Sequence, residues 1–174
     1  MSRTFEDTYF NEDAIYMERN SRDFARRIRI IDENTEAVCD FLYARSIASG
    51  SENVAVKNVY YPKYVTTEHY NKCKISADAG YGGLFSLTFV TPEAARAFFD
   101  TLPCYKGPSL GTNFTLACPY TILAHYLELD WAAKYGIEEG LVRVSVGMED
   151  RRTLLEDFGK ALKVAEAALT SSTS

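Results

Sequence analysis

The chain has 174 residues, is 47% hydrophobic and 25% charged, and carries a formal net charge of −5 at pH 7. This length and composition suit a single globular domain, residues 1–174, with one buried core. The acidic balance argues against a nucleic-acid surface, and no apolar run reaches the roughly 18 residues of a membrane helix. We therefore expect a cytoplasmic protein with neither nucleic acid nor a membrane among its partners.

Cysteine and histidine are too sparse to predict a metal site. The four cysteines lie far apart without a CxxC pair, and the only histidines are His69 and His125. We expect reduced thiols and no bound metal. The most basic stretch falls on a predicted helix and favours a solvated face over a binding patch. It comprises Arg22, Arg26, Arg27 and Arg29.

The first half of the chain predicts a long helix, a strand and a loop. Residues 13–45 carry apolar side chains near helical spacing, which favours one helix lying across a larger body. These apolar positions are Met17, Phe24, Ile28, Ile31, Val38 and Leu42. Residues 56–61 predict a short strand ended by Pro62, and the polar, aperiodic residues 63–81 predict a surface loop.

A buried strand followed by a capped helix is predicted at 84–102. The apolar, β-branched and aromatic residues 84–90 favour a strand. Thr91 is placed to accept first-turn amides, Pro92 suits the first helical position, and Glu93 favours the helix dipole. The buried stripe of this helix is expected to contain Ala95, Phe98, Phe99 and Leu102.

Next come a broken segment and a second strand. Gly107, Pro108 and Gly111 interrupt the chain around Ser109, and residues 122–131 are expected to be helical or turn-rich. Strand alternation over 141–146 places three valines on one face and two polar side chains on the other. The valines are Val142, Val144 and Val146, and the polar residues are Arg143 and Ser145.

A final helix is predicted from about residue 150 to residue 168. Glu149 and Asp150 precede it and are interpreted together as its N-terminal cap. Its inward residues are expected to be Leu154, Leu155, Phe158 and Leu162. The polar residues 170–174 predict a frayed tail.

These elements together predict an α+β fold. A small, mainly antiparallel sheet would be covered by helices, with the long helix 13–45 preceding an α/β sandwich at 54–169.

Two segments contain candidate binding residues in addition to elements of the fold. In GPSLGTNFTL, residues 107–116, the glycines permit a tight turn whose amides near Ser109 and Leu110 could meet an anion, although an ordinary loop is favoured on spacing alone. In LVRVSVGMED, residues 141–150, Arg143 is either solvated or held ready to bind a carboxylate through its planar fork. Without further information, the solvated interpretation is favoured.

The sequence resembles a known enzyme family along most of its length. GYGGLFSLTF, SLGTNFTL and HYLELDWAAKYGIEEGLVRVSVGMEDRRTLLEDFGKAL resemble, in order and spacing, the C-terminal part of the pyridoxal phosphate (PLP)-dependent trans-sulfuration enzymes. This family includes cystathionine γ-synthase, cystathionine lyases and methionine γ-lyase, and the likeness is greatest to fungal cystathionine γ-synthase-like proteins. ERNSRDFARRIRIIDENTEAVCDFL also resembles the long inter-domain helix of the family.

The resemblance implies a substrate site. The arginine of the LVR-x-SVG strand holds the α-carboxylate of the amino-acid substrate in this family, which implies that role for Arg143. The SLG turn lines the same pocket, which implies Ser109 and Leu110. Here the family's SLGG becomes SLGT, so Thr112 alters the pocket wall. The substrate is expected to be a small carboxylate or amino acid.

The resemblance also implies that the cofactor site lies elsewhere. The family's PLP lysine belongs to a motif upstream of the long helix, and no lysine of these 174 residues lies in such a motif. We expect no cofactor bound by this chain alone and no internal Schiff base. A homo-oligomer or a separate PLP-domain subunit would be the partner.

Two other functions remain open. The chain could be a cofactor-independent enzyme that reuses the carboxylate pocket, with His125, Tyr126 and Asp130 as candidate acid and base groups. It could also be a non-catalytic partner or dimerisation module, because a surface that normally packs on a cofactor domain would be apolar.

Overall fold

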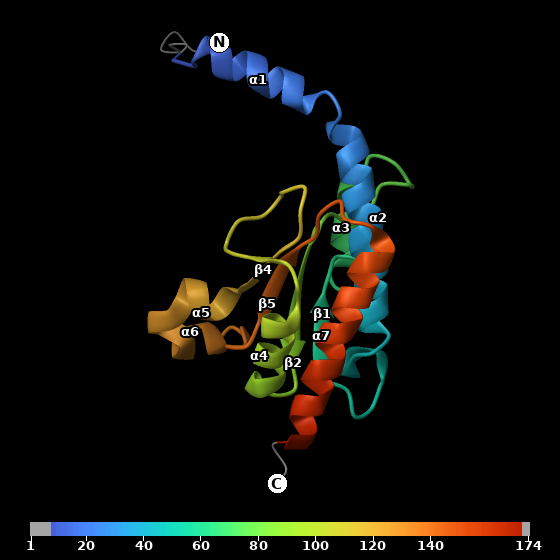
Figure 1. Cartoon of the computed structure of the whole chain (residues 1–174), viewed down its shortest axis with the longest axis vertical. Coiled ribbons are helices and arrows are strands. Elements are labelled where there is room, and N and C mark those ends of the chain that lie inside the picture. Colours follow the sequence, from blue (N-terminus) through green and yellow to red (C-terminus); the bar gives the residue numbers. More distant parts are fainter. Residues whose placement is uncertain (1–7, 172–174) are drawn as a thin grey trace.

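The computed structural model describes residues 8–171 and shows helices packed on one face of a five-stranded sheet (Figure 1). The strands are β1 (Val56–Tyr60), β2 (Leu84–Phe89), β3 (Tyr105–Lys106), β4 (Leu116–Pro119) and β5 (Val142–Ser145). Their order is β1-β2-β5-β4-β3, and only the β3–β4 pair is parallel. The predicted α+β class with a mainly antiparallel sheet is confirmed.

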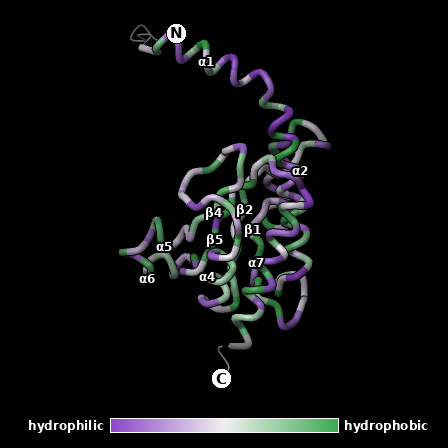
Figure 2. The backbone as a smooth tube through the Cα atoms, viewed as in Figure 1, coloured by the Kyte–Doolittle hydropathy of each residue, from purple (hydrophilic) through white to green (hydrophobic). Residues whose placement is uncertain are grey.

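Three helices bury their apolar faces against this sheet. They are α2 (Phe24–Tyr43), α4 (Pro92–Thr101) and α7 (Arg151–Ser171), with α7 lying against both α2 and α4. The core between the two layers contains Phe85 of β2, Phe98 of α4 and Phe158 of α7, whose rings contact one another in series. In Figure 2, the hydrophobic colour follows the strands of the sheet, whereas α1 (Asn11–Ser21) is mostly hydrophilic.

The single helix predicted over 13–45 is instead two helices, α1 and α2, separated at Arg22 and Asp23. Upstream of Ile31 the chain has left the sheet, so Met17, Phe24 and Ile28 are exposed rather than buried. Without packing to enforce continuity, local polar contacts decide the geometry. Asp23 leaves the helical conformation and its carboxylate pairs with Arg26 and Arg27.

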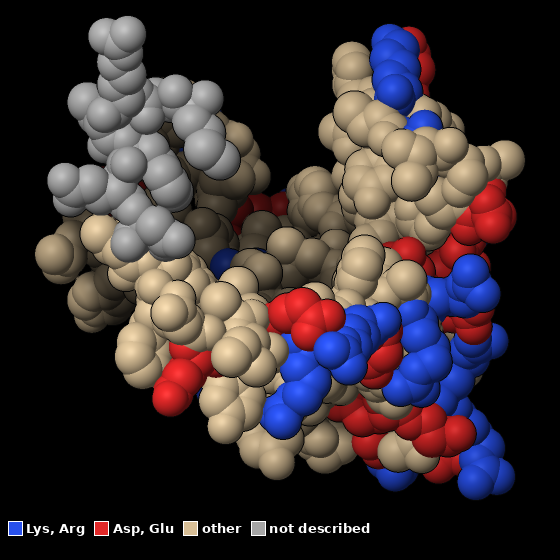
Figure 3. All heavy atoms as spheres, turned by 90° about the horizontal axis from the view of Figure 1, so that it is seen from above, with Lys and Arg blue, Asp and Glu red and all other residues tan. Residues whose placement is uncertain are grey.

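The predicted arginine-rich face is extensively ion-paired. Arg22 pairs with Glu18, in addition to the two arginines held by Asp23. Figure 3 shows basic and acidic side chains interspersed over one side of the face seen from above. The arginines therefore do not form a purely basic surface there.

Other elements differ from expectation in detail. The predicted loop 63–81 contains a short helix, α3 (Thr67–Cys73), and residues 122–131 are covered by α5 (Tyr120–His125), a 3-10 turn and α6 (Leu129–Ala133). Strands β3 and β4 were not predicted. Leu116, Ala117 and Cys118 of β4 are all buried, so its two faces show no hydrophobic alternation.

The C-terminal helix is longer than predicted and extends to Ser171. Of the tail expected at 170–174, residues 172–174 lie outside the described residues. Across residues 8–171, every helix is too short or too polar to cross a membrane.

The N-terminus of α4 is capped as predicted. Thr91 has extended backbone angles, and its Oγ1 accepts a hydrogen bond of 3.2 Å from the Ala94 amide, with Pro92 beginning the helix. This contact satisfies one of the first-turn amides that have no partner within the helix.

We expect Thr91→Ala to lower the free energy of unfolding by about 1 kcal/mol, because the Ala94 amide loses its acceptor. Thr91→Ser keeps the hydroxyl and is the matched control, expected to remain close to the unmodified chain. Urea denaturation of the three proteins measures the difference. An equal loss in both variants would show that the methyl group, and not the cap, is what matters.

Candidate functional site

Strand β5 directs Arg143 away from the core. Val142 and Val144 are 2% and 0% exposed and face the helices, so strand alternation sends the intervening Arg143 to the opposite face of the sheet. There it lies between Ser86 of β2 and Cys118 of β4, its partners in the two neighbouring strands. The predicted two-faced strand is confirmed.

The Arg143 guanidinium is held from two sides. Its Nη2 donates to the carbonyl oxygen of Pro108, and its Cζ lies 4.9 Å from the centre of the Tyr120 ring. Both contacts restrict the side chain before any ligand arrives. Arg143 also lies beside the Cys118 thiol. Burial raises the pKa of this thiol, and the guanidinium opposes part of that rise. Within residues 8–171, no aspartate or glutamate forms a salt bridge with Arg143.

The Ser109 turn meets Arg143 in three dimensions. Pro108 supplies the carbonyl that receives the guanidinium, although the two residues are 35 positions apart. Gly111 has φ of +74°, a backbone conformation that glycine adopts without steric cost. Ser109 and Leu110 are exposed at the crest of this turn, and Leu110 is 54% exposed. The structure thus brings the three residues of the predicted substrate site, Arg143, Ser109 and Leu110, to one region.

Only one of the two carboxylates before α7 caps that helix. Asp150 Oδ1 accepts a 3.0 Å hydrogen bond from the Thr153 amide, which lowers the pKa of Asp150. Glu149 was predicted to share this role, and that prediction is wrong. Its two carboxylate oxygens accept from the amide and the hydroxyl of Thr115 instead. Glu149 points back toward β4, because Met148 pairs with Asn113 and holds the two segments together.

The candidate acid and base groups lie on α5, the following turn and α6. His125 Nδ1 is 2.7 Å from Glu128 Oε1, so its immediate polar partner is neither Tyr126 nor Asp130. Tyr126 is 70% exposed, and Asp130 is also exposed. The His125 ring packs edge-on against Tyr120, which places that tyrosine between His125 and Arg143.

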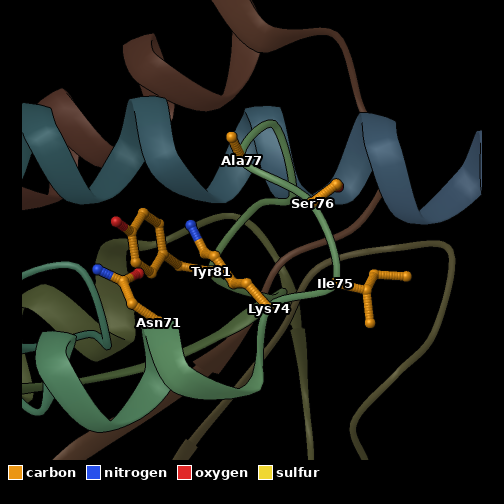
Figure 4. A pocket seen from close by; sticks show the side chains of 6 residues that line it. All are labelled: Asn71, Lys74, Ile75, Ser76, Ala77 and Tyr81. Atoms are coloured by element: carbon orange, nitrogen blue, oxygen red, sulfur yellow. The ribbon is translucent and has the colours of Figure 1, made fainter.

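A hollow that the sequence did not predict lies between α2 and residues 74–82. Its volume is about 990 Å³. Figure 4 shows part of its wall, where Lys74 extends toward Tyr81 while Ile75 points away. The Lys74 Nζ is 3.5 Å from the centre of the Tyr81 ring. No periodic pattern marks these residues in the sequence, so only the folded arrangement reveals the hollow.

Asp32 of α2 is one of the residues that line this hollow. Its Oδ1 accepts a 3.0 Å hydrogen bond from the Gly82 amide. Burial raises the pKa of Asp32 above its ordinary value of 3.8, and the nearby Glu36 adds to this, while the Gly82 bond and Lys74 oppose it. Within the described part of the chain, no group of three or more His, Cys, Asp or Glu side chains is arranged to hold a metal ion.

Comparison with known proteins identifies the family. The model of the Cys/Met metabolism PLP-dependent enzymes matches residues 8–163. The chain belongs to this family. Cystathionine gamma-synthase-like enzyme iboG2 of Amanita muscaria is 54% identical over 94% of this chain and 28% of its own length. Cystathionine gamma-synthase of Neurospora crassa is 47% identical over 95% of this chain and 25% of its own length.

Solved structures of this family share the fold. Cystathionine gamma synthase from Xanthomonas oryzae pv. oryzae, in complex with cystathionine, superposes with a TM-score of 0.72 and 28% identity, over 90% of this chain and 39% of that one. Cystathionine gamma-lyase from yeast gives a TM-score of 0.75 at 28% identity, over 88% of this chain and 38% of that one. The chain therefore spans well under half of each relative.

Five of the described lysines are held by ion pairs or carbonyl oxygens, whereas Lys74 lies in the hollow against the Tyr81 ring. Lys63 pairs with Glu36 and Asp40; burial lowers its pKa, but these hydrogen bonds outweigh burial and raise it. Lys106 donates to the carbonyl oxygens of Phe99 and Leu102 at the end of α4. The other paired lysines are Lys57 with Glu138, Lys72 with Glu68 and Lys160 with Asp157. None of these described lysine contacts involves Arg143.

We expect ionisation of the half-buried Asp32 carboxyl group to lower the free energy of unfolding as pH rises. A raised native pKa means that the folded state binds the proton more tightly, so stability falls from about pH 3.8 upward through the native pKa. Asp32→Asn keeps an acceptor for the Gly82 amide but has no carboxyl group that ionises as pH rises. The stability of this variant relative to the unmodified chain should therefore be greater at pH 7 than at pH 3.5. Urea denaturation across this range tests it, and a difference independent of pH would contradict it.

Proposed function

We propose that this chain forms the substrate-carboxylate-binding part of a PLP-dependent enzyme related to cystathionine γ-synthase, which acts on C–S bonds of amino acids. The observation that supports it most directly is the state of Arg143. This arginine is oriented by Pro108 and Tyr120, yet no acidic side chain of the described residues pairs with it. A guanidinium fixed in this way is complementary to a ligand carboxylate.

The pocket has a division of roles. Arg143 binds the α-carboxylate through two of its N–H groups, while the Pro108 carbonyl continues to hold the guanidinium in place. Ser109 contributes its hydroxyl and main chain to the pocket wall, and Leu110 closes the wall at the exposed side of the turn. The bulkier neighbour of Gly111, Thr112, narrows the room available to the substrate side chain.

The aldehyde chemistry belongs to another part of the enzyme. When bound, PLP supplies an electron sink for carbanion chemistry at the substrate α-carbon. Lys57, Lys63, Lys72, Lys106 and Lys160 are engaged in ion pairs or carbonyl contacts, which supports a cofactor lysine from another segment or a separate subunit. The task of this chain is to bind the carboxylate and fix the orientation of the substrate.

Exposed apolar side chains support a partner at this face. Three large apolar side chains on the C-terminal side of Tyr120 are exposed: Ile122 by 38%, Leu123 by 55% and Leu127 by 95%. Large exposed apolar groups commonly mark an interaction surface. We infer that the cofactor-carrying part, or a second copy of the chain, covers this surface in the assembled enzyme.

We expect L-cysteine to bind at Arg143, with cysteamine, which lacks the carboxylate, failing to do so at the same concentration. Two-dimensional 15N–1H NMR of the isolated chain, titrated to millimolar ligand under reducing conditions, should show shifts at the Ser109 and Leu110 amides and at the Arg143 Nε–H. This method suits the weak affinity expected without the remainder of the enzyme.

The matched variant for this titration is Arg143→Ala. It should abolish the response to L-cysteine while lowering the free energy of unfolding by no more than about 1 kcal/mol, since the site is partly exposed. Unchanged shifts in Arg143→Ala, or equal shifts with cysteamine, would remove the basis for the proposal.

A further inference from the structure

The turn that carries Ser109 and Leu110 is tied to the strand that carries Arg143. The Gly111 amide donates a 3.0 Å hydrogen bond to Ser145 Oγ, two residues after Arg143 on the same face of β5. Ser145 is 5% exposed, whereas Gly111 is exposed. The anchor is therefore buried and rigid, while the group that it holds lies at the surface.

A second connection joins the far end of this segment to the end of β5. Glu149 accepts from the Thr115 amide, and its other oxygen lies 2.9 Å from Thr115 Oγ1. The same hydroxyl accepts a 3.1 Å hydrogen bond from the Gly147 amide. Thr115 is 2% exposed, so its amide and hydroxyl depend on these partners rather than on water.

Close packing reinforces the second connection. A Cβ atom at Gly147 would lie 2.4 Å from the Cα of Phe114, so the two backbones touch only because position 147 is glycine. Asn34 of α2 is 3% exposed and donates from Nδ2 to the carbonyls of Gly147 and Glu149. The helix layer thus fixes the position of Glu149, and Glu149 fixes Thr115.

We propose that Glu149 and Ser145 are positioning residues that set the height of the 107–115 segment over Arg143, and so determine how tightly a ligand carboxylate is bound between them. Glu149 acts through Thr115 at one end of the segment, and Ser145 acts through Gly111 at the other. The inference rests on the proposed function, because it concerns the same carboxylate pocket.

A merely structural role has a different consequence from a positioning role. If the two residues only stabilised the fold, their loss would lower the free energy of unfolding and leave the affinity of the folded chain unchanged. If they position the turn, affinity falls even where stability is nearly kept. Ser145→Ala separates the two cases well, since water can replace the hydroxyl at the exposed Gly111 amide.

The experiment measures the dissociation constant of L-cysteine by NMR for the unmodified chain and five variants, each below its unfolding transition. Glu149→Gln and Thr115→Val each remove part of the hydrogen bonding between Glu149 and Thr115. Ser145→Ala removes the hydrogen bond that the Gly111 amide donates to Ser145. We expect each of these to weaken L-cysteine binding about tenfold, the size of one lost hydrogen bond to a charged or buried group. Thr115→Ser keeps the hydroxyl and should restore affinity close to that of the unmodified chain, even where losing a buried methyl lowers stability.

Glu156→Gln is the charge control, because it removes one negative charge from the exposed face of α7, the helix that follows Glu149, and should leave affinity unchanged. If folded Glu149→Gln and Ser145→Ala bind L-cysteine as tightly as the unmodified chain does, the positioning role is overturned while the proposed function stands. Equal weakening in Thr115→Ser and Thr115→Val would also overturn it, since the hydroxyl would then be irrelevant. No response of the unmodified chain to L-cysteine would overturn the proposed function, and the positioning role with it.

Discussion

The burial of alternate residues of β5 is the constraint on which the candidate site depends. β5 is the central strand of the sheet, and Val142 and Val144 lie in the core beneath α4 and α7. A shift of one residue in this strand would turn the Arg143 side chain into the core and the valines out to solvent, at the cost of a buried, unpaired charge. Hydrophobic packing on one face therefore fixes the direction of the functional side chain on the other.

The pairing of β4 with β5 then brings the other residues of the candidate site to Arg143. Because Cys118 and Arg143 are opposite one another in this antiparallel pair, the segment before β4 and the residues after it pass on either side of the guanidinium. Pro108 comes from the first and Tyr120 from the second. The arrangement around Arg143 is thus a consequence of strand register rather than of any one motif.

The chain belongs to the Cys/Met metabolism PLP-dependent family. The chain matches only 25–28% of the lengths of the Neurospora crassa and Amanita muscaria relatives. Enzymes that use PLP separate two tasks, electron withdrawal by the cofactor and orientation of the substrate by the protein. The proposed function assigns the second task to Arg143 and the turn around Ser109.

Local sequence patterns were sufficient to predict the elements whose buried face follows their own periodicity. The alternation of Val142, Arg143 and Val144 and the Thr91 cap appear in the structure because each depends on near neighbours in the chain. The continuity of the 13–45 helix and the role of Glu149 did not follow from such patterns. The first depended on where the sheet ends beneath Ile31, and the second on a threonine 34 residues away. Sequence by itself determined the inward side chains of the elements that lie over the sheet, such as Val142 and Phe98, and the family that the chain resembles. Only the tertiary structure decided which polar groups meet, because those contacts join segments whose distance along the chain carries no information about their distance in space.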